Sequence, residues 1–172
     1  MKRLFFIPLA FMMSFCKCPK ATIAESNKNS IESVCPENGK CTIELLRNKS
    51  LAVKADEFGS VYYQILESNE TSVVIYRYDK DVPKDLQDAN YREEIIFEIN
   101  NKTQSLSLSG KDLQQCKMLF GRFCFCKGQT GYYKVEDGMI NLIQNDNVVN
   151  FNLDFTITKV PQIIKSIQVT VK

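Results

Sequence analysis

The chain of 172 residues contains no histidine and no tryptophan. Histidine is the side chain that most often acts as a general base near neutral pH. Its absence removes the central group of Ser-His-Asp and Cys-His hydrolases and of His-ligated zinc enzymes. We therefore expect a protein that is not an enzyme and that uses no metal and no cofactor.

Long hydrophobic runs are also absent. The longest covers residues 4–15, whereas a membrane-spanning helix needs about 20 apolar residues. Because Lys2 and Arg3 precede this run, residues 1–24 are predicted to be a secretory signal peptide, cut between residues 16 and 24. A lipid anchor on Cys16 is a less favoured alternative, because the bulky Phe15 precedes it. The mature chain is thus expected to have no transmembrane span.

A strong excess of charge is the third missing feature. The chain carries 22 basic and 20 acidic residues. Cleavage after Ala24 would remove four of the basic residues and leave a small acidic excess. Nothing in this balance indicates a nucleic-acid partner.

The signal sequence predicts an exported protein of the periplasm, the cell envelope or the extracellular space. Asparagine and lysine are plentiful, which favours a bacterial source. In such an oxidising compartment most cysteines are expected to be paired.

Alternating apolar and polar residues dominate the chain after residue 40. Residues 149–157 place five apolar side chains on one face and polar ones on the other, and residues 95–99, 105–109 and 167–171 follow the same pattern. A period of two is typical of strands with one buried face, although Ile96 on the polar side of its segment weakens that example.

These strands, separated by Gly, Asn, Asp and Ser turns, predict an all-β fold. We expect an antiparallel meander that forms a β-sandwich or a lipocalin-like β-barrel, although without tryptophan the Gly-x-Trp sequence of lipocalins is missing. Residues 25–40 are expected to be a loosely ordered leader and residues 41–172 a single β domain. Short helical turns are predicted at residues 81–87 and 112–116.

Cysteines carry the main chemical pattern. The disulfide candidates after cleavage at Ala24 are Cys35, Cys41, Cys116, Cys124 and Cys126. The turn residues 36–40 favour a bridge between the first two. In an extended strand the Cα atoms of residues 124 and 126 would lie about 6.6 Å apart, at the limit for a disulfide. A bridge from one of them to Cys116 is easier to build.

Three functional alternatives for these cysteines stay open. A bond between Cys124 and Cys126 could serve thiol–disulfide exchange, because strained bridges are easily reduced. The two residues and Cys116 could bind a soft metal, or one thiol could bond a partner chain. The favoured interpretation is structural: one bridge and one buried or idle thiol.

Acidic side chains and tyrosines offer two further candidate surfaces. The acidic cluster is Asp79, Asp81, Asp85, Asp88, Glu93 and Glu94. Interleaved basic residues favour a solvated loop face there. Seven tyrosines, several of them adjacent, are expected mainly to form cross-strand pairs, although exposed ones could bind glycan or protein.

The leading hypothesis is a non-enzymatic, disulfide-stabilised β domain that binds a protein, a glycan or a surface. The alternative is a carrier of a small apolar ligand inside a β-barrel. Its expected lining is Phe97, Phe151, Leu153 and Phe155.

Overall fold

The computed structural model describes residues 30–83, 86, 88–145 and 148–172. The predicted signal peptide, Cys16 and residues 25–29 of the predicted leader lie outside these residues. The rest of the leader is described: Ser30–Ile31 form a short strand, and the next strand begins at Gly39. No helix in the described part of the chain is both long and apolar enough to cross a bilayer.

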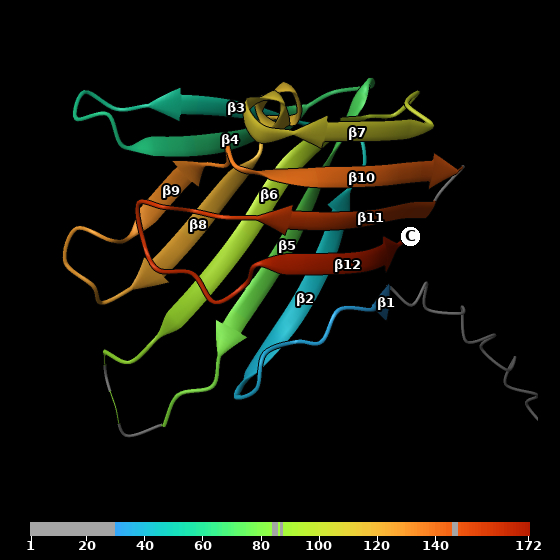
Figure 1. The fold of residues 1–172 in the computed structure, drawn as a ribbon. Helices are drawn as coiled ribbons and strands as arrows, with labels where there is room; N and C mark the ends of the chain where they lie inside the picture. The colour runs from blue at the N-terminus through green and yellow to red at the C-terminus, as the bar shows by residue number, and fades with distance from the viewer. Residues whose placement is uncertain (1–29, 84–85, 87, 146–147) are drawn as a thin grey trace, which may run out of the picture.

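Two antiparallel sheets face each other, so the fold is a β-sandwich and the all-β prediction is confirmed. The five-stranded sheet has the order β1 (Ser30–Ile31), β12 (Ser166–Val171), β11 (Val148–Phe155), β10 (Gly138–Asn145) and β7 (Ser105–Ser109). Figure 1 shows its strands in front of those of the other sheet, which they cross steeply.

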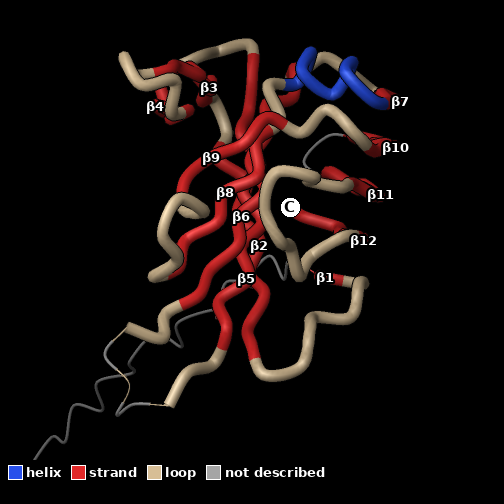
Figure 2. The backbone as a smooth tube through the Cα atoms, turned by 60° about the vertical axis from the view of Figure 1, so that its left-hand side comes forward, coloured by secondary structure: helices blue, strands red, loops and turns tan. Residues whose placement is uncertain are grey.

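The seven-stranded sheet contains the remaining strands. In spatial order these are β2 (Gly39–Leu46), β5 (Thr71–Lys80), β6 (Tyr91–Asn100), β8 (Leu119–Cys124), β9 (Gly131–Lys134), β4 (Val61–Glu67) and β3 (Lys49–Ala55). In the view of Figure 2, the β3–β4 hairpin and the five-stranded sheet lie on opposite sides of strands β6, β8 and β9.

The chain passes between the sheets three times in its second half, first at residues 101–104, which lead from β6 to β7. The 3-10 helix η1 (Gly110–Cys116) connects β7 in one sheet to β8 in the other, and residues 135–137 lead from β9 back to β10. Helix η1 confirms the predicted helical turn at 112–116. Of the other predicted turn, residues 84–85 and 87 are not described, and the rest of 81–87 is not helical.

The inner core, between the two sheets, buries the inward residues of the alternating strands. On β6 these are Ile95, Phe97 and Ile99, which pack with residues such as Phe151 from β11. The predicted inward faces of residues 95–99 and 149–157 are therefore confirmed.

A second, smaller core lies on the other face of the seven-stranded sheet. We call it the outer core; it consists of Leu51, Val73, Ile75, Ile96 and Leu119. Leu51 belongs to β3, so the β3–β4 hairpin covers this face. Ile96 interrupts the alternation because it points into the outer core, where it is fully buried.

Candidate functional site at the Cys124–Cys126 loop

The described residues contain two disulfide bonds. Cys35 and Cys41 are joined across the predicted turn, with Cα atoms 5.8 Å apart. Cys124 and Cys126 are also joined, with Cα atoms 5.2 Å apart. The preference for a bridge to Cys116 was therefore wrong. The reason is that β8 ends at Cys124 and the chain bends at residue 125, which shortens the separation expected for an extended strand.

Cys116 is the only free cysteine among the described residues, and it is buried in η1. Its thiol donates to the Leu113 carbonyl oxygen at 3.0 Å. Burial raises the pKa of this thiol to about 12, so it stays protonated and unreactive at neutral pH. Within the described ranges, no group of three or more Cys, Asp or Glu side chains is placed to hold a metal ion.

Phe125 projects from the loop between the two bonded cysteines. Its side chain is 82% exposed, although a phenylalanine normally buries its ring. Phe125 was not among the candidate residues expected from the sequence, but its position between two cysteines carried a usable pattern. A residue between two cysteines that face the same side of a chain must point the other way.

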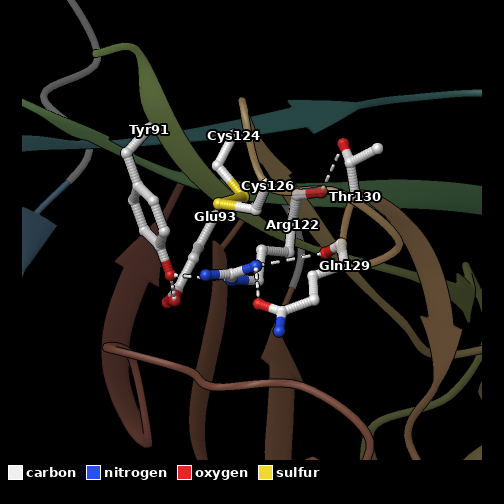
Figure 3. The surroundings of a disulfide bond; sticks show 7 residues. All are labelled: Tyr91, Glu93, Arg122, Cys124, Cys126, Gln129 and Thr130. Carbon is white, nitrogen blue, oxygen red and sulfur yellow. Dashed lines mark hydrogen bonds between the residues drawn. A yellow bond between two sulfur atoms is a disulfide. The ribbon is translucent and has the colours of Figure 1, made fainter. Parts of the chain in front are cut away.

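Hydrogen bonds between Arg122 on β8 and the residues that follow Cys126 hold the loop between Cys124 and Cys126 in place (Figure 3). The Arg122 guanidinium donates to the Gln129 side-chain oxygen at 3.0 Å and to its carbonyl oxygen at 3.3 Å. The Thr130 hydroxyl donates to the Arg122 carbonyl oxygen at 3.1 Å. The backbone N–H of Gln129 donates to the Cys126 carbonyl oxygen at 3.1 Å. Both sides of the loop are therefore tied to β8.

Arg122 itself is held by a buried polar network. Its Nε donates to the Tyr91 hydroxyl at 3.3 Å, and Tyr91 donates to Glu93. The Glu93 carboxylate is 1% exposed and accepts the backbone N–H groups of Ile163 and Ile164 at 2.6 and 2.7 Å. Tyr91 packs against the inner core and Ile164 belongs to it, so this network connects the loop to the inner core.

The acidic cluster predicted as a solvated face therefore divides in two. Asp79, Asp81 and Asp88 are exposed, in agreement with that interpretation. Glu93 and Glu94 are buried, which corrects it, because these two belong to β6 rather than to the preceding loop. Asp85 lies outside the described residues.

Phe125 borders two adjoining clefts, which share part of their lining. The larger, of about 590 Å³, is lined by Asp79, Lys80, Asp88, Asn90, Tyr91, Arg92, Phe123, Cys124 and Thr130 as well as Phe125. The second, of about 360 Å³, includes Val82, Pro83 and Leu86, and Leu86 is 54% exposed. The loop thus places a projecting apolar ring beside charged side chains and beside the apolar residues Val82, Pro83 and Leu86.

The predicted lining of the carrier lies elsewhere. Phe97, Phe151, Leu153 and Phe155 are all buried in the inner core. The rings of Phe97 and Phe151 meet edge to face with centroids 5.2 Å apart. These side chains contact one another, so a ligand would have to displace them.

The tyrosines mostly support the sheet. Tyr76 and Tyr78 are buried in the inner core, and Tyr63 and Tyr132 form an edge-to-face pair with centroids 5.0 Å apart. Tyr62 is 40% exposed. The structure brings no cluster of exposed tyrosines to the Phe125 loop, where Tyr91 is half-buried.

Comparisons with known proteins add no information on function, so a functional proposal rests on the fold and on this loop. The fold defines the class of an all-β sandwich protein. No protein-family model, curated protein sequence or solved structure matches the chain.

Proposed function

We propose that the protein is a non-enzymatic, exported binding domain that inserts Phe125 into a pocket of a partner protein. The observation that carries this proposal is an aromatic ring 82% exposed on a loop closed by a disulfide bond. Aromatic side chains dominate the energetics of protein interfaces, and a side chain held rigid before binding loses less entropy when it docks.

The shape of the loop favours a protein partner over a glycan. Sugars stack on flat aromatic platforms, whereas Phe125 projects beside two adjoining clefts and is flanked by the exposed Leu86. A projecting ring with an aliphatic neighbour fits a concave apolar pocket. Asp79, Lys80 and Arg92 line the cleft beside it and supply a polar rim of both signs, as in protein interfaces.

The carrier of a small apolar ligand remains the second candidate. It requires a space inside the inner core that Phe97, Phe151 and their neighbours now fill. No observation in the structure favours it over the Phe125 site.

The test uses two phenylalanines that are almost equally exposed. Phe58, on the turn between β3 and β4, is 85% exposed, against 82% for Phe125. A photo-crosslinking amino acid is placed at either position in the source cells. We expect one protein to be captured from position 125 and not from position 58. Binding of that purified protein should weaken at least about tenfold in Phe125→Ala and stay unchanged in Phe58→Ala.

A variant with Ser at both positions 124 and 126 tests the role of the bridge. It keeps Phe125 but frees the loop, and should weaken binding by about 1 kcal/mol through the added ordering cost. Equal binding by Phe125→Ala and Phe58→Ala would reject the proposal. Uptake of one equivalent of an apolar probe that Phe97→Leu alters and Phe125→Ala leaves unchanged would favour the carrier instead.

A further inference from the structure

The outer strand β7 has an unprotected edge. It lies at one end of the five-stranded sheet, and β10 is its only partner among the strands that the structure describes. Edge strands are usually kept from pairing with other chains by charged residues, proline or shortness. Edge strands β2 and β3 carry charged residues, and β1 has two residues. Strand β7 has five residues, Ser-Leu-Ser-Leu-Ser, with no charge and no proline.

The ladder to β10 shows which backbone groups of β7 remain free. The N–H of Gln144 donates to the carbonyl oxygen of Gln104 at 2.8 Å, so residues 104 and 144 form a hydrogen-bonded pair. Such pairs recur at every second residue of an antiparallel ladder, hence at Leu106 and Leu108. The N–H and C=O groups of Ser105 and Ser107 and the N–H of Ser109 therefore point to the open edge. The C=O of Ser109, the N-cap of η1, accepts the first hydrogen bond of that helix.

We propose that two copies of the chain associate through β7, antiparallel, about a twofold axis at Ser107. A twofold interface requires a surface complementary to itself. The sequence Ser-Leu-Ser-Leu-Ser reads the same in both directions. With the axis at Ser107, Ser105 lies opposite Ser109 of the second copy. The two Ser107 residues then exchange N–H···O=C bonds in both directions, and the Ser109 N–H of each copy meets the Ser105 C=O of the other.

The side chains on both faces are compatible with this register. On the inner face, Leu106 of one copy lies opposite Leu108 of the other. Both leucines are half-buried and border a cavity of about 160 Å³ that Ile99, Cys116 and Leu142 also line. Pairing continues this apolar layer across the edge. On the outer face only serines meet, so no like charges face each other.

This interface is small, because one strand pair of five residues forms its centre. Weak and transient complexes bury less than about 1,200 Å², and we expect β7 pairing to belong to that class. The dimer should therefore form in a concentration-dependent way, and it rests on β7 alone rather than on the Phe125 loop at the other sheet.

Sedimentation velocity over a concentration series measures the association. Ser107→Pro removes an N–H that points to the open edge and leaves the β10 ladder intact. It should raise the dissociation constant about tenfold or more, because each dimer loses two central hydrogen bonds. Ser107→Ala removes only the hydroxyl that donates to Asn141 at 2.8 Å, and should associate like the natural chain.

Cysteine substitutions test the register. Opposed residues in a hydrogen-bonded pair have Cα atoms about 5.5 Å apart, within disulfide range. Mild oxidation should link Ser107→Cys to itself, whereas Ser105→Cys should link only when mixed with Ser109→Cys. A chain that stays monomeric up to millimolar concentration would overturn the proposal, as would a dimer that Ser107→Pro leaves unchanged or that crosslinks in another register.

Discussion

Glu93 and Glu94 are adjacent on β6, both buried, and hold different parts of the molecule in place. Glu93 faces the inner core and accepts backbone N–H groups of Ile163 and Ile164, some 70 residues away along the chain. Glu94 faces the outer core and accepts the hydroxyls of Tyr63 and Tyr132 at 3.1 and 2.9 Å.

Removal of one or the other carboxylate would free different parts of the structure. Glu93 ties the loop before β12 to the seven-stranded sheet, and it also supports Arg122, which holds the Phe125 loop. Glu94 ties β4 and β9 to the sheet, and Arg77 balances its charge at 3.1 Å. A buried carboxylate is stabilising only when such partners satisfy it. Variants of Glu93 are therefore expected to report on the stability of the whole sandwich, and variants of Glu94 on that of the β3–β4 hairpin and its neighbour β9.

The largest effect is expected for Glu93→Ala. This change leaves two backbone N–H groups and the Tyr91 hydroxyl without an acceptor. We expect the free energy of unfolding to fall by about 3 kcal/mol, as measured by urea denaturation. Glu93→Gln keeps one acceptor oxygen and should cost clearly less. Equal losses for both variants would contradict the assigned hydrogen bonds.

Glu94→Ala should destabilise a smaller region. It removes the acceptor of two tyrosine hydroxyls and of Arg77, and we expect a cost of about 2 kcal/mol. Amide hydrogen exchange should become faster in β3, β4 and β9 than in β10 and β11, because the hydroxyls that Glu94 binds lie on β4 and β9, whereas β10 and β11 belong to the other sheet. Uniform loss of protection across both sheets would show that the outer core is not a separate unit.

Tyr132→Phe dissects the Glu94 site further. It removes one hydroxyl donor and keeps the ring that packs against Tyr63 and Phe123. The expected loss is about 1 kcal/mol in the same urea experiment. A matched variant, Tyr62→Phe, alters an exposed neighbour and should change the stability by less than about 0.5 kcal/mol.

The smallest effect is a decrease in the free energy of unfolding at alkaline pH. One tyrosine on each face of the seven-stranded sheet contributes to it. Burial, followed by the hydrogen bond to Glu93, raises the pKa of Tyr91 to about 12. Burial also raises the pKa of Tyr132 above its usual value of 10. The folded state thus favours the protonated hydroxyls. Their contribution is complete below about pH 10, the unfolded value, and for Tyr91 it is lost as the pH rises to about 12.

Urea denaturation at pH 9, 10.5 and 12 measures this dependence. Tyr91→Phe should begin less stable at pH 9 but lose less stability between pH 10 and 12, since one titrating hydroxyl has been removed. A pH profile parallel to that of the natural chain would show that Tyr91 does not titrate with folding.

Part of the Phe125 site could have been predicted from the sequence. The spacing of Cys124 and Cys126 marked the segment as chemically unusual, and the turn residues around Pro36 indicated the Cys35–Cys41 bridge. The spacing of the cysteines indicated that Phe125 points away from them, but not how far its ring is exposed or that Arg122 supports its loop. The support by Arg122 depends on Tyr91 and Gln129, which lie on other segments of the chain.

The alternation of apolar and polar residues by itself determined the all-β class and the inward faces of β6 and β11, because side chains in a strand alternate between its two faces. The tertiary structure alone decided what covers each face. Ile96 and Glu94 are buried because the β3–β4 hairpin folds over them, and Cys116 stays unpaired because η1 places it in the core. A local period specifies the direction of a side chain, whereas its partner is set by segments that meet only when the sheets pack.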